Sequence, residues 1–520
     1  MKRLQFPISV SMFSFAAILA PVALIHAAEL HVAITGSDAS PGTQAAPLRT
    51  IQRAAEKAIP GDTVTVHAGL YREHVNPPRG GISDSKRIVY RAAPGEKAVI
   101  AGSEIIKQWQ KVQEDVWKAV LPNSLFGGFS PYNDIIGGEW YGTPADGFDR
   151  HPPGRNYITV RGFTMRQAGT PWAGAMSEQI GLIGTHWSKG WIIEENEISH
   201  SMNTGITLGR YDLGRYGIAM PPATAPGFVK TCELASQHGW SKDNIGSHVV
   251  RSNRISHCEK NGIHGSLGGI FSAIEGNIIH DIAVKGWIGG SDVAGLKLLG
   301  SVDTLIKNNH IFLCGGSGGI WLDWMAQWPR VTGNLLHDNA WDLFMEVDHG
   351  PWLIDHNLLL SRNSVRDRSQ GGAYAHNLIQ GNIEARADLS RETPYFAPHT
   401  VADVRLSSFK KTDRRFHNNL FAGGNGTAAF NDWAASVQSG GNVYLAGAGP
   451  STGESGTVVN PDFNPGVKLT EGPDGEWWLE MAVDPVWLSI QTRSLVTTEM
   501  LDKAVIPDLS SRMPMVPLSR

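Results

Sequence analysis

The chain has 520 residues and a formal net charge of -4 at pH 7, with 59 glycines, 17 tryptophans and three cysteines. A nucleic-acid-binding protein needs a basic face, so this weakly acidic balance argues against nucleic acid as a partner. Three cysteines allow at most one disulfide bond, which excludes a disulfide framework, and we expect buried thiols instead.

Residues 1–28 have the pattern of a secretory signal peptide, in which Lys2 and Arg3 precede an apolar run and small residues end it. Pro7 and Pro21 interrupt that run, so we do not expect a membrane anchor. No later stretch is apolar for long enough to span a membrane. We therefore expect an exported protein, either secreted or periplasmic.

The elements after the signal predict a capped stack of strands. Residues 29–33 alternate in polarity as a strand does, and Thr50 is the expected N-cap of a helix over residues 51–58. Residues 63–67 and 71–75 are the next predicted strands. A short helix followed at once by stacked strands is typical of the cap that a β-solenoid needs at its first coil.

An asparagine followed by an aliphatic pair or near-pair recurs along the chain, often 23–25 residues after the previous one. A fixed period of this size indicates a solenoid, whose coils bury their apolar faces only by stacking. Asparagine suits a left-handed backbone position at one bend and can form a side-chain ladder. The repeats are Asn196, Asn253, Asn277, Asn309, Asn334, Asn357, Asn382, Asn419 and Asn442.

The domain organisation follows from where this repeat holds and where it breaks. We expect an all-β parallel β-helix domain at residues 29–445, with an aromatic loop excursion at residues 102–153 and a second excursion at residues 210–243. Both excursions are expected over the face that carries the acids described next, because loops on a rigid scaffold commonly carry binding. Residues 446–520 are expected to form a C-terminal extension packed on the solenoid.

Two short runs combine a strand pattern with a terminal acid. Residues 320–323 and 343–346 read Ile-Trp-Leu-Asp and Leu-Phe-Met-Glu, and each alternates aliphatic with other positions. Asp323 and Glu346 then face away from the core, one turn of the solenoid apart, with backbones about 4.8 Å from each other. Two carboxyls at that spacing can act on one bond. A single outward acid on a strand would be ordinary, but the stacked pair indicates a site.

Four further residues are candidate substrate contacts. His349 is close enough to Glu346 to touch a sugar or to tune the pKa of that acid, and Asp292 enters the preceding coil, where it could hold sugar hydroxyls. Trp321 and Trp324 bracket Asp323, and one of them is a candidate platform for a pyranose ring. Each of the four also has an ordinary structural role open to it. No zinc spacing and no nucleotide-binding fingerprint occurs, so we expect no metal and no cofactor.

The segments GIWLDWMAQ, NLLHDN, DLFMEVDHGP and HNLLLS resemble glycoside hydrolase family 120, which is known for β-xylosidase activity. The similarity extends to PLRTIQRA, GGSDVAGLK and LVTTEMLDKAVIP, and so covers most of the chain. The resemblance implies a right-handed parallel β-helix, with Asp323 as the nucleophile, Glu346 as the general acid/base and Asp292 as an acid that contacts the sugar. Characterised relatives carry a β-sandwich insertion after a stretch like SPYND, and this sequence has no apparent room for it between Ile135 and Asn156.

The expected function is an exported retaining glycoside hydrolase that releases xylose from the non-reducing ends of short oligosaccharides by double displacement. Its expected partner is the oligosaccharide substrate, with no nucleic acid and no membrane. Two alternatives remain open at this stage: a polysaccharide lyase or epimerase on the same scaffold, and a carbohydrate-binding solenoid without catalysis. The fold cannot decide between them, because function is determined by the site.

Overall fold

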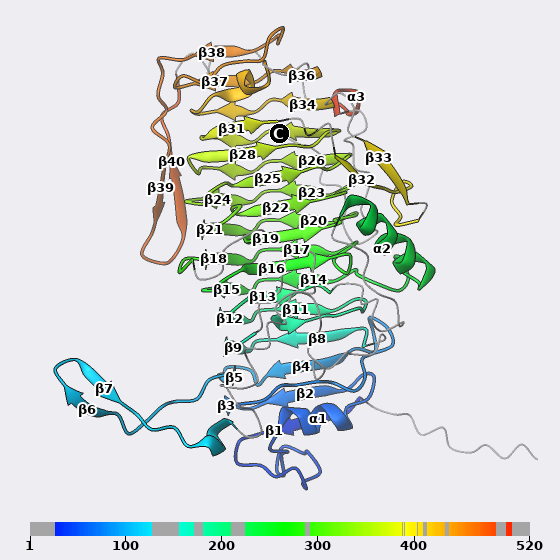
Figure 1. The fold of residues 1–520 in the computed structure, drawn as a ribbon, viewed down its shortest axis with the longest axis vertical. Helices are drawn as coiled ribbons and strands as arrows, with labels where there is room; N and C mark the ends of the chain where they lie inside the picture. Colours follow the sequence, from blue (N-terminus) through cyan, green and yellow to red (C-terminus); the bar gives the residue numbers. More distant parts are fainter. Residues whose placement is uncertain are drawn as a thin grey trace, which may run out of the picture.

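Two long sheets of parallel strands run the length of the molecule, a third covers its middle coils, and the chain passes from one sheet to the next as it winds (Figure 1). The computed structural model describes residues 27–126, 155–170, 180–209, 224–286, 292–386, 388, 391–402, 404–408, 413–431, 436–484 and 496–501. Residues 1–26 of the predicted signal peptide therefore lie outside the described residues. Two sheets have 13 strands and the third has eight, which confirms the expected all-β parallel β-helix.

The strands follow in stacking order, sheet by sheet. Sheet 1 consists of β1 (Glu29–Val32), β2 (Thr63–Val66), β4 (Ile88–Ala92), β8 (Ile158–Arg161), β11 (Ile192–Glu194), β14 (Val249–Arg251), β17 (Ala273–Glu275), β20 (Leu305–Lys307), β23 (Arg330–Thr332), β26 (Trp352–Asp355), β29 (Gly372–Ala375), β34 (Asp413–His417) and β36 (Ser436–Gly440). Sheet 2 consists of β10 (Gly181–Gly184), β13 (Thr204–Thr207), β16 (Asn261–Ser266), β19 (Ala294–Leu299), β22 (Ile320–Asp323), β25 (Leu343–Glu346), β28 (Asn363–Asp367) and β31 (Asn382–Ala385). Sheet 3 consists of β3 (Gly69–Tyr71), β5 (Ala98–Ala101), β9 (Thr164–Ala168), β12 (Glu197–Ser201), β15 (Arg254–Ser256), β18 (Ile278–Ile282), β21 (His310–Cys314), β24 (Leu335–His337), β27 (Leu358–Leu359), β30 (Leu378–Ile379), β35 (Leu420–Phe421), β37 (Val443–Leu445) and β38 (Val458–Asn460).

The remaining elements are short helices and three antiparallel hairpins. The helices are α1 (Ile51–Lys57), α2 (Ala225–Gln237), α3 (Thr498–Leu501) and the 3-10 turns η1 (Asn123–Phe126) and η3 (Gly426–Phe430). The hairpins pair β6 (Gln110–Gln113) with β7 (Val116–Lys118), β32 (Glu392–Tyr395) with β33 (Arg405–Ser408), and β39 (Lys468–Glu471) with β40 (Trp477–Glu480). No helix among the described residues is long and apolar enough to cross a membrane.

Helix α1 closes the first coil, as its sequence predicted (Figure 1). The Thr50 hydroxyl accepts a hydrogen bond from the Arg53 N–H at 3.1 Å, which satisfies one of the free donors at the helix start. Ile51, Ala54 and Ala55 are buried in the core that the coils share. The cap thereby covers the apolar end that the lowest coil would otherwise expose.

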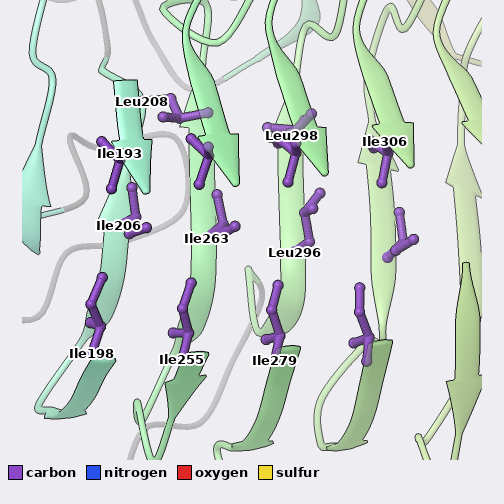
Figure 2. Close-up of a cluster of buried hydrophobic side chains, with 14 of the residues drawn as sticks. Ile193, Ile198, Ile206, Leu208, Ile255, Ile263, Ile279, Leu296, Leu298 and Ile306 are labelled. Atoms are coloured by element: carbon purple, nitrogen blue, oxygen red, sulfur yellow. The ribbon is translucent and has the colours of Figure 1, made fainter. Parts of the chain in front are cut away.

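The core is a set of columns in which equivalent aliphatic residues stack from coil to coil (Figure 2). Ile198 pairs in register with Ile255, which pairs in turn with Ile279, and all three are fully buried. Because a one-residue slip would turn each strand's apolar residues outward, this burial fixes the register of every coil on its neighbours. All three cysteines are buried and free, as expected.

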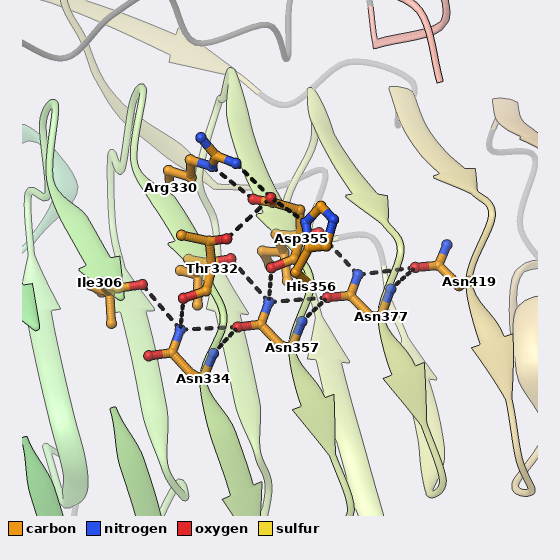
Figure 3. Close-up of polar contacts among 11 residues, drawn as sticks. Ile306, Arg330, Thr332, Asn334, Asp355, His356, Asn357, Asn377 and Asn419 are labelled. Carbon is orange, nitrogen blue, oxygen red and sulfur yellow. Dashed lines mark hydrogen bonds and ion pairs between the residues drawn. The ribbon is translucent and has the colours of Figure 1, made fainter. Parts of the chain in front are cut away.

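The asparagines form a continuous ladder at the bend between sheets 1 and 3 (Figure 3). Asn334 Nδ2 donates to Asn357 Oδ1 at 2.9 Å and to the Ile306 carbonyl at 3.0 Å, while its own Oδ1 accepts the Asn309 backbone N–H at 2.9 Å. The same pattern links Asn196, Asn253, Asn277, Asn309, Asn334, Asn357, Asn377, Asn419 and Asn442. The predicted alignment is therefore confirmed.

One member of the predicted ladder is wrong. Asn382 begins β31 in sheet 2 and has an exposed side chain, whereas Asn377 occupies the ladder position in that coil. The segment His376-Asn377-Leu378-Ile379 carries the same signal as the other repeats. Asn377 follows Asn357 by 20 residues, so this coil is shorter than the assumed period. The assumed period pointed to Asn382 instead of Asn377.

The excursions differ in part from the prediction. Every residue of β6 and β7 is exposed, and this hairpin projects away from the solenoid near β3 and β5, so the described part of residues 102–153 does not cover the acids (Figure 1). The stretch 127–153 lies outside the described residues. Helix α2, from the second excursion, does pack beside the acids' strands, since Phe228 contacts Trp324.

The C-terminal boundary also differs from the predicted residue 445. Strand β38 pairs in parallel with β37, so the stacking of sheet 3 continues to Asn460. The β39–β40 hairpin then folds back along sheet 3, where Trp477 contacts His310 and His337 (Figure 1). The extension therefore contributes one more strand to the solenoid and a covering hairpin.

The ladder predicts a stability effect. Replacing Asn334 by Ala leaves buried backbone groups without partners, so we expect the free energy of unfolding to fall by about 2 kcal/mol or more. Denaturant titration followed by circular dichroism measures it. Asn382→Ala, outside the ladder and exposed, is the matched control and should change the midpoint little. Equal midpoints for the two variants would contradict a structural role for the ladder.

Candidate active site

Asp323 and Glu346 end neighbouring strands of sheet 2 at the same register. Strands β22 and β25 are parallel, and Asp323 is the direct partner of Glu346. The preceding residues, Leu322 and Met345, are 0% and 1% exposed and belong to the shared core, so the alternation of the strands turns both acids outward. The spacing of the two acids along the sequence predicted this arrangement.

Lys297 on β19 lies one coil before Asp323 and was missed by the sequence analysis. Its Nζ is 2.9 Å from Asp323 Oδ2, forms a second ion pair with Asp292, and lies 3.7 Å from the centre of the Trp321 ring. The side chain is 2% exposed. A buried ammonium is costly unless opposite charges surround it, and these two carboxylates provide them.

Several polar atoms at this site have no partner among the residues that the structure describes. They are Asp292 Oδ2, Asp323 Oδ1 and Trp321 Nε1, and all three are buried. Buried polar groups are nearly always hydrogen-bonded, so unsatisfied ones require an explanation. Two carboxylate acceptors and an indole donor in one cluster match the hydrogen-bonding groups of a polyhydroxylated ligand.

Glu346 has a different environment from Asp323. Its Oε1 accepts a hydrogen bond from Arg391 Nη1 at 3.0 Å. Burial raises the pKa of Glu346 above its ordinary value, and the charge of Asp323 raises it further, whereas Arg391 and Lys297 oppose the rise. One carboxyl therefore favours the protonated form beside another that is paired with an ammonium. Such a divided pair is the arrangement that supplies an acid and a nucleophile together.

The two tryptophans, one of which was predicted as a sugar platform, have charged and aromatic neighbours at their rings. Trp321 stacks on Phe344 with ring centres 5.1 Å apart, and Lys297 approaches it from the preceding coil. Arg391 lies 4.9 Å from the centre of the Trp324 ring, and the Trp324–Phe228 contact with α2 is edge-on at 5.7 Å. Phe344 and Lys297 thus cover the Trp321 ring, whereas Trp324 is only partly buried and its role as a platform stays a prediction.

His349 lies three residues after Glu346 but is held by other neighbours. Its Nε2 is 2.6 Å from the Thr393 hydroxyl on β32, and its Nδ1 is 3.2 Å from Gln370 Nε2. The ring is buried. His349 thus connects the turn that carries Glu346 to the β32–β33 hairpin.

The sequence gives a signal for the position of Lys297 but none for that of Arg391. Lys297 is the polar residue of the alternating run Leu296-Lys297-Leu298, so its outward position on the strand before β22 could have been inferred. Arg391 precedes a hairpin that leaves the solenoid, and no period relates it to Glu346. Among the described residues, no group of three or more His, Cys, Asp or Glu side chains is placed to hold a metal ion.

Comparisons with known proteins relate the chain to carbohydrate-active enzymes. A family model described as "Glycoside hydrolase 120, insertion domain" matches residues 106–164, and one described as "Right handed beta helix region" matches residues 180–383. A third model, of a family of unknown function, matches residues 34–76. The first match shows that the expected absence of the insertion is wrong, because sequence related to it includes the β6–β7 hairpin and begins upstream of the SPYND stretch.

Among solved structures, a complex of XylC with xylose is 34% identical, with a TM-score of 0.78 over 89% of this chain and 90% of that chain. Pectate lyase Pel9A is more distant, at 12% identity and a TM-score of 0.38 over 83% of this chain and 81% of that chain. The uncharacterized protein YwoF of Bacillus subtilis (strain 168) is 38% identical over 76 residues, which are 15% of this chain and 16% of that protein.

The buried cation predicts a pH-dependent stability effect. Lys297→Met leaves two buried carboxylates without their cation, so we expect a loss of about 3–5 kcal/mol in unfolding free energy near neutral pH. In the variant, two buried carboxylates lie close together without a cation, and protonation relieves that cost, so the loss should shrink as the pH falls. Denaturant titrations across pH measure it, with Lys307→Met, on sheet 1, as the control. A loss independent of pH would contradict the role of charge.

Proposed function

This chain belongs to glycoside hydrolase family 120 and is a glycosidase, and we propose that it is a retaining β-xylosidase acting on xylo-oligosaccharides from their non-reducing ends. The observation that carries the proposal is the register pair of Asp323 and Glu346, in which one acid is paired with a buried ammonium and the pKa of the other is raised. The solved XylC complex with xylose, which aligns over most of both chains, supports a pentose as the released sugar.

Asp323 is the proposed nucleophile. Lys297 holds Asp323 Oδ2 in an ion pair, while Oδ1 has no partner among the described residues and is available to attack. Attack forms a bond from this oxygen to the anomeric carbon as the glycosidic C–O bond breaks. The lysine therefore orients the nucleophile without occupying the reacting oxygen.

Glu346 is the proposed general acid and base. Its raised pKa keeps a proton that it gives to the leaving oxygen in the first step. In the second step, the ionised Glu346 takes a proton from water, the water oxygen attacks the anomeric carbon, and the bond to Asp323 breaks. Xylose leaves with its original configuration, Glu346 is protonated again and Asp323 is again a carboxylate.

The spacing of the strands supports retention rather than inversion. Neighbouring parallel strands are about 4.8 Å apart, so acids at one register lie within reach of the separation of about 5–5.5 Å that direct attack requires. Inversion would need about 6.5–9.5 Å, which leaves room for a water molecule between sugar and base. Asp292, whose free oxygen lies in the same cluster, is the proposed acceptor for a sugar hydroxyl.

Residues 1–28 support the further proposal that the enzyme is exported, to the periplasm or the medium. The lyase and epimerase alternative predicts an unsaturated or epimerised polysaccharide instead of free xylose. The binding-solenoid alternative predicts sugar binding without turnover. The register pair, with an ion pair on Asp323 and a raised pKa on Glu346, favours the glycosidase over both alternatives.

The substrate proposal predicts the outcome of a panel of p-nitrophenyl glycosides. The β-xyloside should be hydrolysed in preference to the α-arabinofuranoside, β-glucoside and α-fucoside, as measured by nitrophenolate release. Asp323→Asn should lower kcat by at least about a thousandfold, because a nucleophile is removed. Glu275→Gln, on the outer surface of sheet 1, is the control. Preference for another glycoside would refute the xylosidase proposal, and release of an unsaturated product from a polyuronide would favour the lyase.

The role of Glu346 predicts chemical rescue. Glu346→Ala should retain activity on an activated aryl xyloside, whose leaving group needs no proton, and added azide should give the β-xylosyl azide. Rescue of Asp323→Ala, where it occurs, should give the α-azide, because azide then replaces the nucleophile. Identification of the azide anomers by NMR measures this, and an exchange of the two results would reverse the assigned roles.

Arg391 predicts a shift in the pH profile. Activity requires protonated Glu346, so kcat/KM should fall as the pH rises through the pKa of Glu346. Because Arg391 lowers that pKa, Arg391→Met should move the alkaline limb to higher pH. The control is Arg405→Met on the exposed strand β33, which should leave the limb in place. A shift toward lower pH would contradict the assignment of Glu346 as the acid.

A further inference from the structure

A cavity of about 430 Å³ lies between the β32–β33 hairpin and the turns of three successive coils. Trp328, His349 and Gln370 line it from the turns that follow β22, β25 and β28, and Tyr395, Ser407 and Ser408 line it from the hairpin. Neither Asp323 nor Glu346 is among the lining residues. The cavity has the size of small-molecule sites, which are typically about 300–1,000 Å³.

The walls of this cavity are built from well-held side chains. Trp328 is buried and packs against His399 with ring centres 4.9 Å apart. Tyr395 meets the buried His349 ring edge-on at 5.5 Å, and His349 is fixed by the Thr393 hydroxyl at 2.6 Å. The hairpin and the coil turns are therefore joined through His349, and the cavity between them is a formed feature of the fold.

The lining defines the chemistry of a ligand. Trp328 and Tyr395 provide aromatic surface, and Gln370, Ser407 and Ser408 provide uncharged donors and acceptors. No Asp, Glu, Lys or Arg is among the residues that the structure gives as its lining. Aromatic rings combined with neutral amide and hydroxyl groups suit a neutral ligand with apolar C–H faces and several hydroxyls. We propose that this cavity is an accessory saccharide-binding site, separate from the acid pair.

The hairpin makes the accessory site relevant to the catalytic one. Arg391 directly precedes β32 and binds Glu346, and Tyr395 at the end of the same strand faces the cavity. A saccharide held against Tyr395 and His349 is thus bound to the segment that positions Arg391. The saccharide class rests on the lining alone, and only the choice of a xylose-based probe rests on the proposed function.

The test is calorimetric titration of the wild-type chain with thioxylobiose and, separately, thiocellobiose, whose sulfur linkages resist hydrolysis. We expect two binding events per chain with at least one of the two probes. Tyr395→Ala removes an aromatic wall and Ser407→Trp fills the cavity, so each should abolish one event and leave the other. Leu406→Ala is the matched control, because Leu406 lies on the same strand, is exposed and does not line the cavity.

The outcomes separate this inference from the proposed function. A single event with both probes, or two events that survive both substitutions, would overturn the accessory site. Circular dichroism of the variants identifies loss of folding. Because one substitution removes a wall and the other fills the cavity, a result that both give does not come from one misfolded variant. If the wild type fails to hydrolyse xylosides but one event still depends on Tyr395 and Ser407, the xylosidase proposal fails and the accessory site stands.

Discussion

The coil-to-coil register of the parallel strands is the constraint on which the site depends. Backbone hydrogen bonds between strands, the aliphatic columns of the core and the asparagine ladder each fix this register independently. Since side chains alternate along a strand, a slip of one residue would turn Asp323 toward the apolar core and Leu322 away from it. Asp323 and Glu346 are separated by one strand spacing, because every coil of the solenoid stacks on the next at that spacing. The geometry of the acid pair is a property of the repeat rather than of a specialised loop.

The electrostatics of the site follow from placing charges on that rigid surface. Lys297, Asp292 and Asp323 are buried together, so the charges offset one another's desolvation. Glu346 lies at the end of this group, where burial and the charge of Asp323 raise its pKa and Arg391 restrains the rise. The same register that stacks the two acids also makes them inequivalent, because only Asp323 has a lysine in the preceding coil.

The sequence allowed much of the fold and the central pair of the site to be predicted. Two signals identified the strands of Asp323 and Glu346. Alternation reflects the two faces of a strand, and the period reflects the length of one coil. Asn382 was misassigned because one coil is shorter than the period. One of Trp321 and Trp324 was predicted as a sugar platform, but alternation gives the face of a residue and not its neighbours, so the contacts of Trp321 with Phe344 and Lys297 were not foreseen. Arg391 and the accessory cavity depend on a hairpin outside the repeat, for which periodicity carries no information.

In the proposed mechanism, Asp323, which is ion-paired with Lys297, forms a covalent bond to the sugar, and Glu346, whose pKa is raised, supplies the proton. Labelling with a 2-deoxy-2-fluoro-β-xyloside carrying a good leaving group tests it most directly, since the fluorine slows hydrolysis of the glycosyl-enzyme. Mass spectrometry of the digested protein should locate the fluoroxylosyl group on Asp323. A label on Glu346, or turnover of the reagent without any labelled peptide, would contradict the account.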